Sequence, residues 1–143
     1  MTSADLKQRL STFMDVIWNT GDFSNLADYV SELYTIKHDP GDAWEGQTLD
    51  RATFQERVMY SRNAFPDLNF AIQEMLTEDN RIVAFWMMSG THEGDLNNLP
   101  ATGKQFAISG MTIYDLNENG KVCGHTQAYD RLGFLGQIGI LKV

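Results

Sequence analysis

Residues 66–73 read Pro-Asp-Leu-Asn-Phe-Ala-Ile-Gln, and the hydrophobic pattern of the 143-residue chain changes at this stretch. Before it, apolar residues recur at steps of three and four, which is the period of an amphipathic helix. From Leu68 onward, apolar and polar residues alternate, which is the period of a half-buried strand. The residue before a proline avoids helical angles, so a helix is expected to end at Phe65. Helices followed by strands predict an α+β fold.

Three helices are predicted before this stretch. The first is capped by Thr2 or Ser3 and ends at Gly21, and its buried stripe is Leu6, Leu10, Phe13, Met14 and Ile17. The second is short, is capped by Ser24 and carries Leu26, Tyr29, Val30 and Leu33. The third is capped by Asp50, and Phe54, Val58 and Phe65 mark its buried stripe. We expect these helices on one side of a curved antiparallel sheet.

Four strands are predicted after the helices, at residues 68–73, 81–91, 106–116 and 122–130. Asn119-Gly120 suits a tight hairpin turn, because both central residues of such a turn have positive φ. A polar loop, residues 93–103, separates the second and third of these strands. No internal repeat or linker is visible, so residues 1–143 are interpreted as a single domain.

Composition and charge exclude several classes of protein. The formal charge is −8, and 43% of the residues are hydrophobic. A negative chain is a poor partner for nucleic acid or for an anionic membrane surface. The single cysteine, Cys123, excludes an internal disulfide. The first residues lack the pattern of a signal peptide and no run is long enough to span a membrane, so the expected location is the cytoplasm.

The last predicted strand carries the most informative side chains. His125, Gln127 and Tyr129 share one face of it, because side chains alternate along a strand. If the hairpin turn has two residues, Thr112 and Tyr114 lie on the same face. These hydrogen-bonding groups inside an apolar domain favour a pocket over a wetted surface. Asp115 and Asp130 have the opposite parity and are expected to face away.

His38 and His92 are two further candidates for functional groups. His38 precedes Asp39-Pro40 and is a candidate polar group near the pocket, although a turn position is the plainer interpretation. His92 is expected at the rim of the pocket. The three histidines lack the spacing of a zinc site, so no metal is predicted.

Large apolar side chains are either core or pocket wall, since ligand pockets are lined mainly by such groups. Trp18, Trp44, Phe65 and Phe85 are candidate ligand contacts on this basis, as is Met14. Trp86 belongs to the same set of aromatic residues. Packing alone explains each of them equally well.

Several short stretches, in order along the chain, resemble the SnoaL-like polyketide cyclases. They are Trp18-Asn19-Thr20-Gly21-Asp22 and the stretches at residues 38–40, 65–68, 90–94 and 129–139. The resemblance implies the nuclear-transport-factor-two-like fold, a cone-shaped α+β barrel around a cavity, and a homodimer. It also implies ring closure by an intramolecular aldol step without metal or cofactor.

One site residue departs from the pattern of that family. The family's acid/base aspartate is the third residue of a His-x-Asp-x-x-Asp-like pattern, which here reads His125-Thr126-Gln127-Ala128-Tyr129-Asp130. An amide cannot take up a proton in the useful pH range, whereas His125 on the same face can. Phe85 stands where relatives often carry arginine, which would make the cavity wall more apolar.

Three hypotheses remain open from the sequence. The first is an enzyme that acts on a hydrophobic carbonyl compound, with His125 as base, Gln127 as hydrogen-bonding group and His38 as a secondary polar group. The second is a protein that binds such a ligand without chemistry. The third is another acid/base task, such as isomerisation or hydrolysis, and it ranks lower because no carboxylate is expected inside the pocket.

Overall fold

The computed structural model describes residues 1–142, in which four α-helices, one π-helix and six strands form a mixed α+β fold. The helices are α1 (Ser3–Phe13), the π-helix η1 (Met14–Asn19), α2 (Leu26–Tyr29), α3 (Arg51–Ala64) and α4 (Arg131–Gln137). The strands are β1 (Val30–His38), β2 (Thr48–Asp50), β3 (Asn69–Glu78), β4 (Arg81–Thr91), β5 (Gln105–Leu116) and β6 (Val122–Tyr129). The α+β class predicted from the sequence is confirmed.

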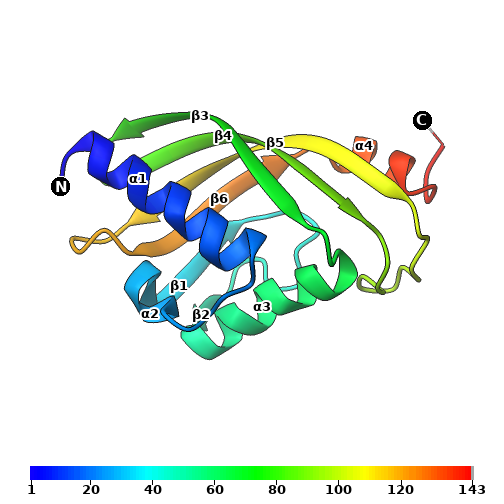
Figure 1. The fold of residues 1–143 in the computed structure, drawn as a ribbon, viewed down its shortest axis with the longest axis horizontal. Helices are drawn as coiled ribbons and strands as arrows, with labels where there is room; N and C mark the ends of the chain where they lie inside the picture. Colours follow the sequence, from blue (N-terminus) through cyan, green and yellow to red (C-terminus); the bar gives the residue numbers. More distant parts are fainter. Residues whose placement is uncertain (143) are drawn as a thin grey trace.

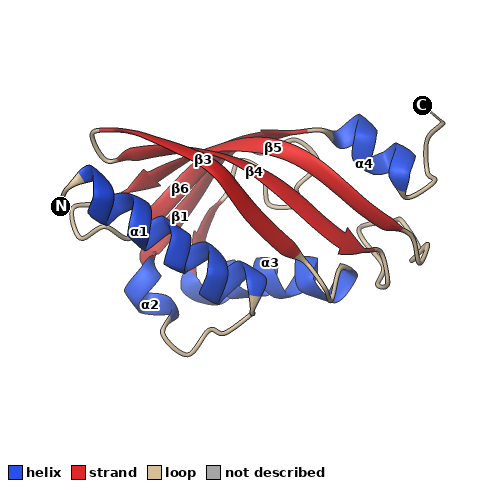
Figure 2. Ribbon diagram, turned by 45° about the horizontal axis from the view of Figure 1, so that its top comes forward, coloured by secondary structure: helices blue, strands red, loops and turns tan. Residues whose placement is uncertain are grey.

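The strands form one curved open sheet in the order β2-β1-β6-β5-β4-β3 (Figure 1). Figure 2 shows α1, α2 and α3 on the same side of this sheet, while α4 lies beyond the end of its long strands. No helix of the described residues is both long and apolar enough to cross a membrane.

Strand β1 corrects two predictions. Val30–His38 is a strand, whereas the sequence pattern predicted that the second helix continued to Leu33; Leu33 is 59% exposed, so it does not belong to a buried stripe. β1 also pairs with β6 in parallel, with Ile36 opposite His125, so the sheet is not antiparallel throughout. Parallel neighbours end at the same edge of a sheet. The residues that follow β1 therefore lie beside the second half of β6.

Two of the three predicted helix caps are present, whereas Ser24 does not cap α2, whose N-cap residue is Asn25 without a side-chain hydrogen bond. Thr2 caps α1 through a reciprocal capping box with Asp5, and the side chain of Asp50 accepts a hydrogen bond from the backbone N–H of Thr53 at the start of α3. The first helix is not uniform, because its last part is the π-helix η1. Asn19 then pairs with Phe70 of β3, accepting from its N–H at 2.7 Å and donating to its C=O at 3.0 Å. These two hydrogen bonds fix the end of η1 against the sheet.

The hairpin between β5 and β6 differs from the predicted two-residue turn. The N–H of Asn117 donates to the C=O of Lys121, which leaves a three-residue loop, and Gly120 alone among these described loop residues has positive φ. A register shift then follows, because Leu116 faces Val122 but Asp115 faces Gly124. The extra residue of the bulge, Cys123, compensates for the longer loop. The faces of β6 are therefore the ones that a two-residue turn would give.

The C-terminal helix α4 was not predicted, so the three helices expected before the strands are not the full set within residues 1–142. The side chain of Asp130 caps α4 by accepting from the N–H of Gly133 at 2.8 Å. Phe134 of α4 packs edge-on against Phe65 and Phe106, with ring centroids 5.8 and 4.9 Å apart. These contacts attach the C-terminal helix to the end of α3 and to β5.

Candidate active site

Polar side chains from β5 and β6 face the helices as a continuous set. Tyr114 pairs with His125, Thr112 with Gln127 and Gly110 with Tyr129, so the shared face predicted from the sequence is present. The missing side chain of Gly110 matters, since a Cβ there would lie 2.4 Å from the Trp86 ring and 2.8 Å from Tyr129 Cβ. Trp86 and Tyr129 therefore approach each other over Gly110.

A chain of hydrogen bonds sets the orientation of the Gln127 amide. The indole N–H of Trp86 can only donate, and it donates to Thr112 Oγ1 at 2.9 Å. Thr112 in turn donates to Gln127 Oε1 at 2.8 Å. The amide nitrogen of Gln127 consequently points the other way, toward Asp39, whose Oδ1 lies 3.4 Å from it.

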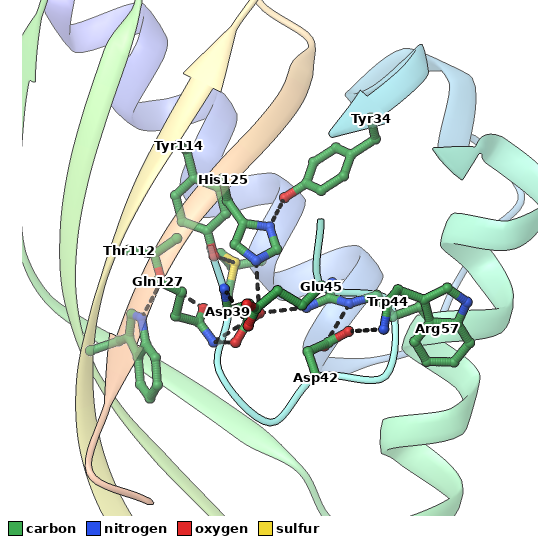
Figure 3. Close-up of polar contacts among 12 residues, drawn as sticks. Tyr34, Asp39, Asp42, Trp44, Glu45, Arg57, Thr112, Tyr114, His125 and Gln127 are labelled. Carbon is green, nitrogen blue, oxygen red and sulfur yellow. Dashed lines mark hydrogen bonds and ion pairs between the residues drawn. The ribbon is translucent and has the colours of Figure 1, made fainter. Parts of the chain in front are cut away.

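Asp39 brings a buried carboxylate into this network (Figure 3). It directly follows β1, and the parallel pairing of β1 with β6 places it beside Gln127. Its Oδ2 accepts from His125 Nε2 at 2.8 Å and from Arg57 Nη2 at 3.1 Å. Within residues 1–142, the contact with Gln127 is the only hydrogen bond of Oδ1, and it is long. One oxygen of the carboxylate is therefore held firmly, and the other remains available.

His125 is satisfied at both ring nitrogens. Nε2 donates to Asp39, and Nδ1 accepts from the hydroxyl of Tyr34 at 2.5 Å. Burial raises the pKa of Tyr34 well above its usual value, so the hydroxyl keeps its proton. Burial also lowers the pKa of His125, and the hydrogen bond to Asp39 opposes this only in part. His125 is thus a neutral imidazole without a lone pair directed at the pocket.

Arg57 of α3 joins two carboxylates. Its Nη2 donates to Asp39 at 3.1 Å and its Nε to Asp42 Oδ2 at 2.9 Å. Burial alone would lower the pKa of Arg57, but Asp42, Tyr34 and Asp39 raise it above its usual value. The guanidinium also lies 5.3 Å from the ring centre of Trp18, within range of a cation–π interaction.

A pocket of about 120 Å³ opens beside these groups. Its apolar wall includes Trp18, Trp44, Tyr60, Phe65, Phe70 and Trp86. Its polar groups include Asp39, Asp42, Arg57, Gln127 and Tyr129. Gly41, Ala43 and Asn97 line it and are exposed, so the pocket reaches solvent between the β1–β2 loop and the loop after β4. A volume of this order holds about one aromatic ring, and the open side leaves room for more.

Five of the candidate residues named from the sequence line this pocket: Trp18, Trp44, Phe65, Gln127 and Tyr129. Two more hold lining residues in place, since His125 binds Asp39 and Thr112 orients Gln127. Tyr114 belongs to the core, where its hydroxyl donates to the Met14 sulfur at 3.5 Å. Burial raises the pKa of Tyr114 to about 12.

The other candidates lie elsewhere. Phe85 is on the opposite face of β4 from Trp86, so it does not make the pocket wall more apolar. His38 is exposed at the end of β1. His92 is fully buried instead of sitting at a rim, and its Nδ1 lies 3.1 Å from Thr102 Oγ1. Met14 is a core residue outside the pocket lining.

Sequence reasoning missed Asp39 and Arg57. The alternation of Tyr34, Thr35 and Ile36 was the available signal, because it marks a strand that ends just before Asp39. Arg57 stands on the buried stripe of α3 between Phe54 and Val58, where a cation needs a partner. In residues 1–142, no cluster of three or more His, Cys, Asp or Glu side chains is arranged to hold a metal ion.

Comparisons with known proteins agree with this architecture. A candidate polyketide cyclase from Acidithiobacillus ferrooxidans is 40% identical, with a TM-score of 0.86 over 96% of this chain and 97% of that one. TsrD from Streptomyces laurentii is 23% identical, with a TM-score of 0.81 over 99% of each chain. IdmH, a candidate polyketide cyclase from Streptomyces antibioticus, is 20% identical, with a TM-score of 0.76 over 94% of this chain and 98% of that one. At 23% and 20% identity, the likeness of TsrD and IdmH to this chain is a likeness of fold.

A comparison with curated proteins finds no match. The model of the SnoaL-like polyketide cyclase family, however, matches residues 8–138. This match runs from α1 to the end of α4 and includes every residue of the polar network just described. The chain belongs to the SnoaL-like polyketide cyclase family.

Proposed function

We propose that this protein is a cyclase-type enzyme that transfers a proton on a hydrophobic carbonyl compound, with Asp39 as the acid/base group. The observation that carries the proposal is the state of the Asp39 carboxylate. His125 and Arg57 hold Oδ2, while Oδ1 has only the long contact with the amide of Gln127, and both Asp39 and Gln127 line the pocket. This is the arrangement of a positioned general base.

Asp39 replaces His125 as the proposed base. The Nδ1 lone pair of His125 is engaged by Tyr34, and its Nε2 already carries a proton that it donates to Asp39. His125 therefore acts as a positioning residue for the carboxylate. His38 has no role in this proposal because it is exposed.

Two side chains can donate hydrogen bonds to the carbonyl oxygen of the substrate. Arg57 uses Nε and Nη2 for its carboxylates, which leaves Nη1 to donate to a ligand. The amide nitrogen of Gln127 is directed toward the same end of the pocket by Thr112. Donors placed where negative charge develops lower the energy of an enolate.

The reaction then needs only proton transfers and one new carbon–carbon bond. Asp39 Oδ1 removes a proton from the carbon next to the carbonyl group, and the electron pair moves to the oxygen as an enolate. The enolate carbon attacks a second carbonyl carbon of the same molecule, whose oxygen becomes an alkoxide. Asp39 returns its proton to that alkoxide. No electron acceptor enters this balance, so the proposal includes no cofactor.

The proposal also accounts for Gln127. The resemblance places the acid/base aspartate of the family at this position, and an amide cannot replace it in proton transfer. The carboxylate of Asp39, contributed by the neighbouring strand, lies 3.4 Å from the amide nitrogen. In this protein the catalytic carboxylate is thus proposed to come from the end of β1 instead of from β6.

Deuterium exchange tests the proton transfer without knowledge of the natural substrate. The protein is incubated in D₂O with 2-tetralone and related bicyclic aromatic ketones, and NMR measures deuterium uptake next to the carbonyl group. We expect exchange above the buffer rate. We expect Asp39→Asn to lower the enzymatic rate by about 10²- to 10⁴-fold, the usual contribution of general acid–base catalysis.

Asp28→Asn is the matched control, since Asp28 lies on α2, is exposed and does not line the pocket. Its exchange rate should equal that of the unmodified protein. Full exchange in Asp39→Asn would exclude Asp39 as the base. Ketones that bind without any exchange would instead support a binding protein without chemistry.

A further inference from the structure

The charges of the ionised side chains that line the pocket do not sum to zero. Arg57 is 5% exposed and Asp39 is 2% exposed, and they form an ion pair with a 3.1 Å separation. Asp42 forms a second ion pair with the same guanidinium, at 2.9 Å, and its side chain is 17% exposed. One cation therefore faces two carboxylates, which gives the cluster a net charge of minus one.

Neither His125 nor the tyrosines supply a compensating charge. Burial lowers the pKa of His125, so the ring is neutral, with Nε2 donating to Asp39 and Nδ1 accepting from the hydroxyl of Tyr34. The hydroxyl of Tyr34 donates to it and so keeps its proton. The remaining wall of the pocket is largely aromatic.

Two more charged residues stand at the rim, with opposite signs. Glu45 is exposed and accepts from the backbone N–H of Asp39 at 3.2 Å. Arg131 is exposed and its guanidinium lies against Gly41. Water and salt screen exposed charges, whereas buried ones are screened much less. The net charge felt inside the pocket is thus set by Asp39, Asp42 and Arg57.

We propose that Asp42 makes this pocket selective for uncharged ligands, so that it takes the ester, amide or ketone of an aromatic skeleton and rejects the corresponding free carboxylate. The inference rests on the proposed function in one respect, that the pocket is the ligand site. A ligand carboxylate would leave water for an apolar wall beside a net negative cluster, and both effects oppose binding. An uncharged carbonyl oxygen accepts from Arg57 without this repulsion.

The selectivity is assigned to Asp42, because its negative charge is the one that the single positive charge of Arg57 leaves unbalanced. Asp39 alone would neutralise the guanidinium. Asp42 accepts from Arg57 with Oδ2 and from the N–H of Trp44 with Oδ1 at 2.9 Å, so it is held rigidly in the wall. Removal of its charge would leave the Arg57–Asp39 pair balanced and the pocket neutral.

Three probes of nearly the same shape test the proposal: methyl 2-naphthoate, 2-naphthamide and 2-naphthoate. Trp18, Trp44 and Trp86 are the three tryptophans of the chain and all line the pocket. Their indole N–H signals in ¹⁵N NMR therefore report ligand binding directly. At neutral pH and low salt, we expect 2-naphthoate to bind at least about tenfold more weakly than the ester and the amide.

Asp42→Asn should reduce this discrimination to less than about threefold, mainly by tightening the binding of 2-naphthoate. Asp28→Asn makes the same change in total charge at an exposed position of α2 and should preserve the full discrimination. A thermal melt of each variant checks folding. If Asp42→Asn does not fold, the comparison of the three probes on the unmodified protein decides alone.

The proposal is overturned if 2-naphthoate binds the unmodified protein as tightly as the ester, or if folded Asp42→Asn keeps the same discrimination. Failure of all three probes to shift the tryptophan signals overturns it as well. These outcomes are separate from those of the exchange experiment. A charge-selective pocket without deuterium exchange would leave this inference standing while the proposed enzymatic function failed.

Discussion

At the scale of the residue, Asp39 shows what a strand pattern cannot indicate. The alternation in β6 correctly placed His125, Gln127 and Tyr129 on one face, because side-chain parity is a local property. The partner of His125 is 86 residues away in sequence. Only the pairing of β1 with β6 brings the two together. The local face could therefore be predicted, whereas the carboxylate that completes the site could not.

His125 should make stability depend on pH. Burial lowers the pKa of His125 in the folded protein, whereas the pKa in an unfolded chain is about 6.5. As the pH falls below this value, the unfolded chain binds a proton that the folded protein does not, so the free energy of unfolding decreases. Urea denaturation at pH 7.5 to 5.5 should show a loss of up to about 1.4 kcal/mol per pH unit.

His125→Gln should remove most of this slope, and His38→Gln should keep it because His38 is exposed. Equal slopes in the protein and in His125→Gln would assign the pH dependence to other groups.

At the scale of the element, the caps of α1 and α3 were predicted, whereas the cap of α2, the hairpin turn and the pairing of β1 with β6 were not. Thr2 and Asp50 cap their helices as expected, because a cap depends on residues within one turn. β1 was missed because Leu26, Tyr29, Val30 and Leu33 also fit a helical period. The chain there is helical only to Tyr29. Parallel pairing with β6 then depends on the whole sheet, which no local pattern encodes.

Asp50 offers a test of the α3 cap. Its side chain accepts from the N–H of Thr53 at 2.8 Å, and α3 carries Arg57. Asp50→Ala should lower the free energy of unfolding by about 1 kcal/mol, because the N–H then lacks its protein acceptor. Urea denaturation measures the change.

Asp50→Asn keeps an acceptor oxygen and should cost much less than Asp50→Ala. The capping interpretation would be wrong if the two variants were equally destabilised.

At the scale of the whole molecule, α4 attaches the end of the chain to the core. Phe134 is 7% exposed, packs against Phe65 and Phe106, and also lines the pocket. The α+β class could be predicted, because segments with the hydrophobic period of helices precede segments with the period of strands. α4 did not, because seven residues with two glycines give too short a pattern to predict.

Phe134→Ala should therefore lower stability and enlarge the pocket together. Removal of a buried phenylalanine side chain costs about 3 kcal/mol or more, which chemical denaturation can measure. The NMR titration with methyl 2-naphthoate should show altered affinity in the same variant.

Phe134→Leu keeps most of the apolar volume and should lose less stability. A Phe134→Ala variant as stable as the unmodified protein would show that α4 contributes little to the core.

The hairpin between β5 and β6 has a consequence for changes in chain length. Its three-residue loop and its bulge at Cys123 each add one residue, and together they preserve parity. Deletion of Cys123 would remove only the extra residue, so Asp115 would still face Gly124 and the side chains beyond it would stay where they are. Removal of one loop residue would shorten the loop to two residues while Asn117 still faced Lys121, which leaves the register of β6 unchanged as well. A deletion between Gly124 and Gln127, where the pairing is regular, would instead turn Gln127 toward the opposite face of the sheet. Changes of length in this hairpin should therefore be confined to the loop and the bulge.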